Sequence, residues 1–313
     1  MHSASIIIPT YNRPKELRDC LESLLAQTVK PLEVIVVDDG NLDEVPFRQD
    51  FIDAGVGFVY FKKDIPGLTE SRNAGIGLAK GEIIFFLDDD VILFPDYVEQ
   101  ILSVYAEGEG FVAGVGGLED NKPPMRPRDY VKRAFEWPFL AWGLREGHVL
   151  PSGFCTQFGE SPFPLKEVTQ VDFLLGGVCS FHRDLFREFS FTERYREFGL
   201  GEDKDFTVSV SRRYPLYLNP KARLVHLEAA AMRPEDRRWA RMFLMGTYLL
   251  FKRHMCRGWW SWPLFWYGVT GHFLARCVAL AVFPNRGKVE KLKGLVDAVK
   301  IIAGGKAPEI GGR

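Results

Sequence analysis

The feature that most constrains the fold is an alternation of short apolar runs with helix-length amphipathic stretches, between residue 5 and about residue 117. Strands buried on both faces read as apolar runs, and helices between them indicate a sheet of parallel strands. The predicted strands are 6–8, 34–37, 56–61, 83–87 and 111–115, and the predicted helices include 14–27 and 95–107. The fold class is therefore α/β, with a mostly parallel central sheet flanked by helices.

The remaining chain changes character twice. Residues 119–170 are rich in Pro, Gly and aromatic residues and show no sustained period except a predicted helix around 130–142. Regular patterns return over 171–226, including a predicted helix at 183–189 and a strand that ends at His226. We therefore predict one domain over 1–230, with halves 1–117 and 118–230, followed by a helical, apolar C-terminal region over 231–313.

Charge and cysteine content exclude several classes of protein. The formal net charge is −1, from 40 basic and 41 acidic residues, so there is no global attraction to nucleic acid. Five cysteines without a C-x-x-C spacing favour reduced thiols and a cytoplasmic location. The chain begins almost directly with a strand, without the apolar segment of a secretory leader, which also favours the cytoplasm.

Three motifs lie where predicted strands end, and the carboxyl ends of parallel strands share one edge of a sheet. The first is a strand end followed by a helix that starts with proline, and its backbone N–H groups open at that edge. The second contains two carboxylates that suit a base or ribose hydroxyls, although an ordinary Asx-Gly turn explains it equally in isolation. The third begins a helix that carries an arginine. This arginine can bind a diphosphate or can simply lie on the surface. Their residues are Pro9, Thr10, Tyr11 and Arg13; Asp38, Asp39 and Gly40; and Gly67 to Gly75 with Arg72.

The fourth and fifth motifs are acidic. Asp88, Asp89 and Asp90 follow an apolar strand, and three crowded carboxylates repel one another unless a cation neutralises them. Mg²⁺ and Mn²⁺ prefer such oxygen ligands and bridge them to phosphates. Glu202-Asp203 opens a predicted helix and His226 ends a strand; alone, these would be a helix cap and a surface histidine.

The five motifs in this order resemble glycosyltransferase family 2, which has the GT-A nucleotide-diphospho-sugar transferase fold and is inverting, and the similarity includes rhamnosyltransferases. The resemblance covers about residues 5–226. It implies that residues 1–117 bind the nucleotide and that 118–230 bind the acceptor and hold the catalytic group. The one departure is Asn41, where the family commonly has serine after Asp-Gly.

The resemblance also implies a role for each motif residue. Nucleotide-sugar binding falls to Pro9, Thr10, Tyr11, Arg13, Asp38, Asp39, Arg72, Asp88 and Asp89. The metal ligands are Asp90, Asp88 and His226, for Mn²⁺ or Mg²⁺, and the catalytic base is Asp203, with Glu202 as the alternate. The implied activity is transfer of a hexosyl or deoxyhexosyl group to a saccharide or lipid-linked acceptor, in cell-surface glycan or glycolipid synthesis. A catalytically silent nucleotide-sugar-binding or membrane scaffold protein is the alternative.

The C-terminal region indicates contact with a membrane. Residues 259–283 are almost continuously apolar, but His272 and Arg276 interrupt them and Pro263 breaks their start. Tryptophans at one end lie beside basic residues, as in an interfacial anchor, and 288–302 is amphipathic. We predict peripheral contact with the inner face of the plasma membrane through 235–302. Packing on the catalytic domain, or on a second subunit of a homo-oligomer, is the alternative.

Overall fold

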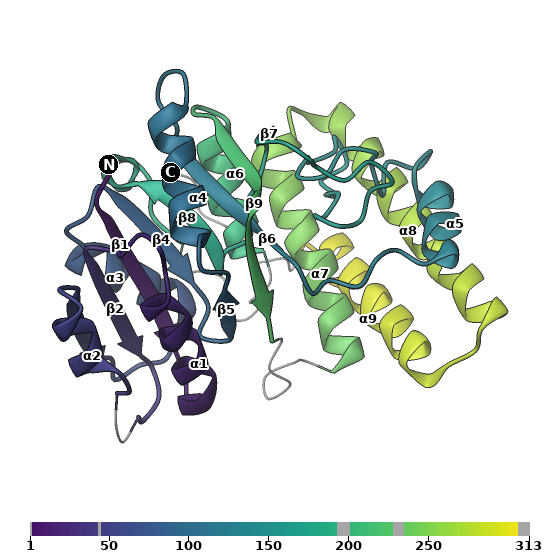
Figure 1. Ribbon diagram of the computed structural model, residues 1–313. Coiled ribbons are helices and arrows are strands. Elements are labelled where there is room, and N and C mark those ends of the chain that lie inside the picture. Colours follow the sequence, from purple (N-terminus) through teal and green to yellow (C-terminus); the bar gives the residue numbers. More distant parts are fainter. Residues whose placement is uncertain (1, 43–44, 193–200, 228–234, 306–313) are drawn as a thin grey trace. The chain divides into compact units, whose positions relative to one another are not determined.

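The computed structural model describes residues 2–42, 45–192, 201–227 and 235–305, and the chain forms two compact units. Unit 1 consists of Met1–Lys122, Leu165–Glu193 and Phe206–Ala230, and unit 2 of Pro123–Pro164, Arg194–Asp205 and Ala231–Arg313. The sheet of unit 1 and the long helices of unit 2 are drawn in Figure 1. The functional division at residue 230 stays a prediction.

Unit 1 is built around a sheet that has nine strands within the described residues, in the order β3-β2-β1-β4-β8-β6-β9-β5, with β7 paired to β9. The strands are β1 (Ala4–Thr10), β2 (Glu33–Asp38), β3 (Gly57–Lys62), β4 (Ile83–Leu87), β5 (Val91–Leu93), β6 (Gly114–Glu119), β7 (Thr169–Val171), β8 (Val178–His182) and β9 (Leu216–His226). The helices are α1 (Pro14–Leu25), α2 (Arg48–Asp53), α3 (Leu68–Leu78), α4 (Tyr97–Glu107) and the 3-10 helix η1 (Arg183–Arg187), and the boundary between the units falls within α6 (Glu202–Ser211).

Most strands of the sheet run in one direction. β1 is parallel to β2 and β4, β2 is parallel to β3, and β6 is parallel to β9. β8 is antiparallel to β4 and β6, while β5 and β7 are antiparallel to β9. Six strands therefore share a direction and three oppose it, which confirms the predicted α/β fold with a mostly parallel sheet.

The core of unit 1 explains why the first strands could be read from the sequence. Ile6, Ile8, Val34, Val36 and Phe85 are fully buried and belong to one apolar cluster. Each is part of a run in which neighbouring residues on both faces of the sheet are buried as well. Burial on both faces removes the polar alternation of a half-exposed strand, so these strands appear as continuous apolar runs.

Several predicted boundaries were wrong. The strand predicted at 111–115 is β6, which begins at Gly114 and continues to Glu119; its glycines offer no side chains to form an apolar pattern. The helix predicted at 130–142 is α5 (Pro127–Glu136), which proline favours at its start and Pro138 limits at its end. The remaining shifts are small: 56–61 became β3, 95–107 became α4, 183–189 became η1, and 171–181 contains the end of β7 and most of β8.

Unit 2 is helical. It contains α5, α7 (Asp236–Leu250), the π-helix η4 (Phe251–Met255), the 3-10 helix η5 (Trp259–Ser261), α8 (Trp262–Val282) and α9 (Arg286–Ala303). Its apolar cluster includes Leu244, Met245, Phe251, Phe265 and Leu295, so α7, α8 and α9 share one core. Within the described residues, Trp259–Val282 is the one helical segment with the length and composition of a membrane span, and 33% of its apolar 18-residue stretch is buried inside the protein.

His272 of α8 is buried against α5, and Arg276, one turn later on α8, is half-buried. His272 Nδ1 lies 3.0 Å from Glu136 Oε1, and Arg276 Nε donates to His272 Nε2 over 3.3 Å. Since Nε2 accepts this bond, the imidazole is neutral, with its proton on Nδ1 facing Glu136. Burial lowers the pKa of His272 to about 4. For Glu136, burial is outweighed by His272 and Lys132, and the pKa falls to about 2.

These pKa shifts predict a loss of stability in mild acid. His272 binds a proton in the unfolded state below pH of about 6.5 but in the folded state only below about 4, so its contribution declines as the pH falls between those values. The free energy of unfolding should drop by on the order of 2 kcal/mol between pH 7 and pH 5 from this group. Urea unfolding of the wild type and of His272→Gln checks this: the variant should be less sensitive to pH in this window, and equal pH slopes would contradict it.

Candidate functional site

The carboxyl ends of five strands that share one direction place polar side chains at the same edge of the sheet. β1 ends at Thr10, β2 at Asp38, β6 at Glu119 and β9 at His226, and Asp88 follows the last residue of β4. In β1, β2 and β4 the polar residue stands at the end of a buried apolar stretch. Unit 1 therefore gathers side chains from distant positions in the sequence, as expected at the ligand-binding edge of an α/β sheet.

Asp88, Asp90 and His226 form a cluster that could hold a metal ion. One ligand atom from each residue lies within 4.8 Å of the others, and His226 Nε2 is 3.0 Å from Asp90 Oδ1. The backbone sets this proximity, because Val91 pairs with His226 across β5 and β9 and Leu227 N donates to Asp90 O. The three residues predicted as metal ligands are thus brought together, and their ligand role stays a prediction.

Glu119 is a member of this cluster that the sequence interpretation missed. His226 Nδ1 lies 3.2 Å from Glu119 Oε1. A carboxylate on the far nitrogen orients a ligating imidazole and directs its other nitrogen toward a cation. The bond to His226 lowers the pKa of Glu119. Burial lowers the pKa of His226, but its bonds to Asp90 and Glu119 outweigh burial and raise it to about 10.

Basic side chains of the protein neutralise part of the acidic cluster. Arg13 Nη1 lies 3.0 Å from Asp89 Oδ1 and 3.3 Å from Asp90 Oδ2, and Arg72 Nη2 lies 3.7 Å from Asp88 Oδ1. Burial raises the pKa of Asp89 to about 6, although Arg13 and a hydrogen bond from Thr10 oppose the shift. Arg13, predicted to contact the nucleotide sugar, therefore contacts Asp89 and the candidate metal ligand Asp90.

Asp38 and Asp39 are buried and hydrogen-bonded within the fold. Asp38 accepts from Gly40 N at 2.7 Å and from Tyr60 Oη at 2.8 Å. Burial raises its pKa, but these bonds and others outweigh burial, so that the pKa is lowered. Asp39 accepts hydrogen bonds from Ser71 and from the backbone of Gly67. The Asx-Gly turn is thus present, and binding of a nucleotide by either carboxylate stays a prediction.

The other predicted nucleotide-binding residues differ in exposure. Pro9 is buried in β1, whereas Tyr11 is exposed. Arg72 is buried, with its guanidinium 5.4 Å from the centroid of the Phe191 ring. Gly177 adjoins Asp88 so closely that a Cβ there would lie 1.9 Å from Asp88 Oδ2. The absence of a side chain at Gly177 therefore makes room for the Asp88 carboxylate.

The predicted catalytic pair belongs to the first turn of α6. Glu202 and Asp203 are half-buried there, in the part of the helix that belongs to unit 2. Asp205, two residues after Asp203, is buried, accepts from Arg253 and lies 2.8 Å from His254 Nε2. Asp205 therefore ties the first turn of α6 to the π-helix η4. The sequence interpretation missed this anchor, because it depends on a pairing about 50 residues away.

Replacing Glu119 with Ala should weaken Mn²⁺ binding by about 10–100-fold, the usual loss when the partner of a ligating histidine is removed. Isothermal titration of the protein with Mn²⁺ measures this loss. Asp120→Ala is the matched control, since this neighbouring carboxylate pairs with Arg223 at the surface. Equal Mn²⁺ affinity in the Glu119 variant and the wild type would remove Glu119 from the site.

Comparison with known proteins finds sequence relatives of this chain. The sequence model of glycosyl transferase family 2 matches residues 5–189, which is more than half of the chain. A glucosyl-dolichyl phosphate glucuronosyltransferase of Haloferax volcanii is 31% identical over 187 residues, covering 59% of this chain and 54% of that protein. Glycosyltransferase GlyA of Streptococcus pneumoniae is 32% identical over 110 residues, covering 35% and 16%. The chain thus spans about half or less of these curated relatives.

Solved structures with the same fold include two that hold nucleotides. The mannosyltransferase PcManGT of Pyrobaculum calidifontis, in complex with GDP-Man and Mn²⁺, has a TM-score of 0.57 at 16% identity, covering 95% of this chain and 87% of that one. S. aureus TarS 1-349 in complex with UDP has a TM-score of 0.53 at 15% identity, covering 95% and 81%. The predicted GT-A fold is confirmed by these likenesses, and by its sequence and fold the chain belongs to glycosyl transferase family 2.

Proposed function

We propose that the protein is an inverting glycosyltransferase that moves a hexosyl or deoxyhexosyl group, such as rhamnosyl, from a nucleotide-diphosphate sugar to a saccharide or lipid-linked acceptor. Its role would be in cell-surface glycan or glycolipid synthesis. The observation that carries the proposal is the cluster of Asp88, Asp90 and His226 within 4.8 Å of one another at the carboxyl edge of the sheet. The nucleotide-bound neighbours of the same fold support a nucleotide-sugar donor.

The cluster has the chemistry of a site for Mn²⁺ or Mg²⁺. Two carboxylates and an imidazole are ligands that such cations accept, and Glu119 on His226 Nδ1 is the outer partner typical of a metal-bound histidine. Asp88, Asp90 and His226 would hold the ion. When bound, the ion would neutralise the charge that develops on the leaving diphosphate.

The residues of the first strands would bind the donor. In this proposal Tyr11, exposed after β1, packs against the base. The carboxylates of Asp38 and Asp39, at the end of β2, would face the ribose. The basic side chain of Arg72 would face the diphosphate. Arg13 holds Asp89 and Asp90 in place, so its part in donor binding is indirect.

Asp203 would be the catalytic base, with Glu202 as the alternate. It accepts the proton from the acceptor hydroxyl, whose oxygen then attacks the anomeric carbon on the face opposite to the diphosphate. Attack from that face inverts the configuration and needs a single base. Asp205, held by Arg253 and His254, fixes the turn from which Asp203 projects.

The C-terminal helices would contact the cytoplasmic face of the membrane. Residues 235–302 contain twelve Lys or Arg against four Asp or Glu, a net charge of +8 in a chain whose net charge is −1. Trp259 and Trp260 are 84% and 52% exposed, and Val278 and Val282 are also exposed on α8. Exposed tryptophans and aliphatic residues beside basic residues suit an anionic lipid surface.

Sedimentation with lipid vesicles tests this contact. The wild type should bind phosphatidylglycerol-containing vesicles more tightly than pure phosphatidylcholine vesicles, with affinity falling as salt rises. The double variant W259A/W260A should bind several-fold more weakly, because it loses the interfacial aromatic rings. Phe163→Ala is the control, since Phe163 is also exposed but lies outside 235–302. Failure of the wild type to bind anionic vesicles would contradict the contact.

A thermal-shift screen tests the proposed function. Nucleoside diphosphates and nucleotide sugars are compared with and without Mn²⁺, because a ligand of the native state raises the melting temperature by mass action. Metal-dependent stabilisation by one nucleotide would support the transferase and identify the donor's base. No shift with any nucleotide would favour a silent scaffold protein instead.

A further inference from the structure

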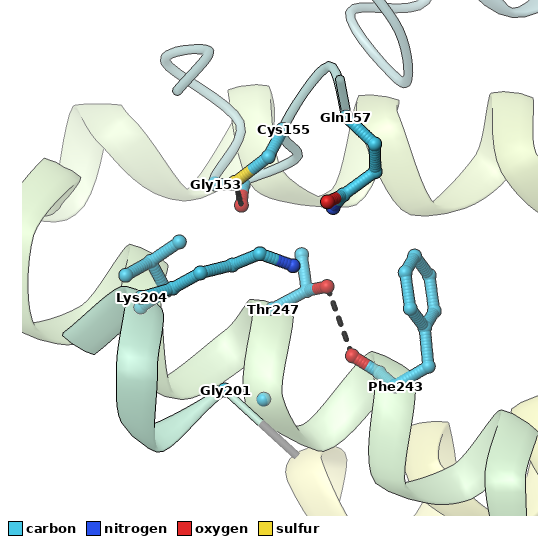
Figure 2. Close-up of a pocket in the computed structure, with 9 residues that line it drawn as sticks. Gly153, Cys155, Gln157, Gly201, Lys204, Phe243 and Thr247 are labelled. Carbon is cyan, nitrogen blue, oxygen red and sulfur yellow. Dashed lines mark hydrogen bonds between the residues drawn. The ribbon is translucent and has the colours of Figure 1, made fainter. Parts of the chain in front are cut away.

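The pocket beside the start of α6 has room for water but not for a sugar. Its wall includes Lys204, Phe243 and Thr247, and the Thr247 hydroxyl donates to Phe243 O over 2.9 Å (Figure 2). Its volume of about 30 Å³ holds about two water molecules. Most of the large exposed apolar side chains of unit 2 lie on or next to α5 and α8 instead, so these two helices are where a larger partner would bind.

The helix α5 is amphipathic, but its apolar face is exposed to solvent. Residues three, four and seven positions apart lie on one face of a helix. Tyr130, Ala134 and Trp137 form one such row, and Val131 and Phe135 form the next. All five are exposed, Val131 by 72% and Trp137 by 54%. A helix whose outer face meets only water normally has polar residues there.

The charged face of α5 is turned into unit 2. Glu136 is fully buried, with Oε2 2.9 Å from Arg133 Nη1 and Oε1 3.8 Å from Lys132 Nζ. Its Oε1 also lies 3.0 Å from His272 Nδ1 of α8. The helix therefore satisfies its charges inside the protein and leaves its apolar residues outside. Covering that outer face with an apolar environment would be favourable.

A stripe along α8 has the same character. Pro263, Tyr267, Leu274, Val278 and Val282 are exposed, at intervals of four or seven residues that keep them on one side of the helix. None of the exposed residues of α8 carries a charge. The opposite side of α8 packs into the core of unit 2, so only this stripe is open to a partner.

Aromatic rings join the apolar face of α5 to the stripe of α8. The two helices lie side by side (Figure 1). The ring centroid of Phe139 is 5.1 Å from that of Tyr267 and 5.6 Å from that of Phe135. A Cβ on Gly271 would lie 2.1 Å from Phe139 Cβ, so the glycine lets this ring lie against α8. The two exposed faces therefore form one continuous apolar surface.

The charges near this surface favour an anionic lipid as the partner. Exposed arginines lie at the helix ends: Arg126 and Arg128 at the start of α5, Arg257 just before η5, and Arg286 at the start of α9. Apolar and aromatic residues bordered by basic ones match the hydrocarbon and headgroups of an anionic membrane. A second copy of the chain would bring the same positive charges to the contact, which disfavours it.

We propose that α5 and the exposed stripe of α8 together insert into one leaflet of an anionic membrane. The proposal rests on the membrane contact proposed for 235–302 and extends it to residues 127–138. Because the other side of α8 is packed in the core of unit 2, α8 lies along the leaflet and does not cross it.

Sedimentation with phosphatidylglycerol-containing vesicles tests the part played by α5. Val131→Asp should weaken binding by about tenfold, because an apolar side chain is lost from the lipid contact and a charge takes its place. Val131→Leu should bind like the wild type. Phe163→Asp is the matched control, since it places the same charge on an exposed residue of unit 2 that belongs to neither helix. Melting temperatures verify that the variants fold.

The outcomes separate this proposal from the one on which it rests. Equal binding by the wild type and Val131→Asp would overturn the role of α5 and leave the contact through 235–302 in place. Failure of the wild type to bind would remove both. Sedimentation velocity without lipid should give one oligomeric state for the wild type and Val131→Asp. A dimer that dissociates in the variant would assign the surface to a second copy and overturn the proposal.

Tryptophan fluorescence locates α5 in the leaflet directly. Vesicles whose acyl chains carry bromine quench tryptophans that reach the hydrocarbon. Trp137→Phe should lower the fraction of emission that these vesicles quench, because Trp137 belongs to the exposed face. Trp142→Phe should not lower it, because Trp142 is buried in unit 2. An undiminished quenched fraction in Trp137→Phe would show that α5 stays outside the leaflet and would overturn the proposal.

Discussion

Replacing Asp203 with Asn is expected to lower kcat for sugar transfer by about 10²–10⁴-fold, the range that a general base contributes. The amide has nearly the shape of the carboxylate but cannot take the proton of the acceptor hydroxyl. Binding of the nucleoside diphosphate should change little, because Asp203 is not among the residues predicted to bind the nucleotide sugar. Steady-state kinetics and calorimetric nucleotide titration of the same preparation separate the two effects.

Glu202→Gln is the comparison for that experiment. A smaller loss in this variant than in Asp203→Asn would assign the base to Asp203, and the reverse order would assign it to Glu202. Both side chains are half-buried in the first turn of α6, so both variants should fold. Full activity in both would show that neither carboxylate is the base.

Replacing Asp90 with Asn is expected to weaken Mn²⁺-dependent binding of the nucleoside diphosphate by more than about 100-fold. Loss of an outer partner alone typically costs 10–100-fold in metal affinity, and Asp90 would be a direct ligand. Its carboxylate is 3.0 Å from His226 Nε2, so the variant also loses the charge that faces His226. Calorimetric titration in Mn²⁺ and in EDTA measures the effect.

The Asp90 variant needs a control for folding, because Asp90 is buried and also contacts Arg13. The melting temperature reports any loss of stability, and Asp120→Asn shows the effect of removing a surface carboxylate from the same sheet edge. Unchanged nucleotide affinity of Asp90→Asn in Mn²⁺ would mean that the metal binds elsewhere.

The strands that carry the donor motifs could be predicted because their burial leaves a continuous apolar run in the sequence. β4 was placed at its observed bounds, and its carboxyl end led directly to Asp88 and Asp90. The distance from His226 to Asp90 could not be derived from spacing. It depends on the antiparallel pairing of β5 with β9, which adds a strand of opposite direction at the edge of the sheet.

Glu119 was missed for a physical reason. β6 contains three glycines, Gly114, Gly116 and Gly117, so that its alternation of side chains is weak and the strand was predicted to end at residue 115. With the end placed four residues too early, an acid at the carboxyl edge was interpreted as the beginning of a loop. An acidic residue that follows a glycine-rich strand in an α/β sheet is the signal that would have identified it.

In unit 2, contacts between residues that are far apart in the sequence could not be predicted. Arg276 and His272 were interpreted as interruptions of an apolar segment, and their partner Glu136 is 136 residues from His272. Side chains that satisfy one another over such a distance leave no local pattern. The same holds for Asp205 with His254.

Sugar transfer is measured most directly by phosphorus NMR of the stabilising nucleotide sugar incubated with the protein, with water as the acceptor when no other is supplied. We expect conversion to the nucleoside diphosphate in Mn²⁺ and none in EDTA, because the bond from the anomeric carbon to the diphosphate is the one that breaks. Conversion that persists in EDTA would contradict the metal-assisted mechanism. Release of a nucleoside monophosphate with a sugar phosphate, or no consumption of a donor that binds, would contradict glycosyl transfer.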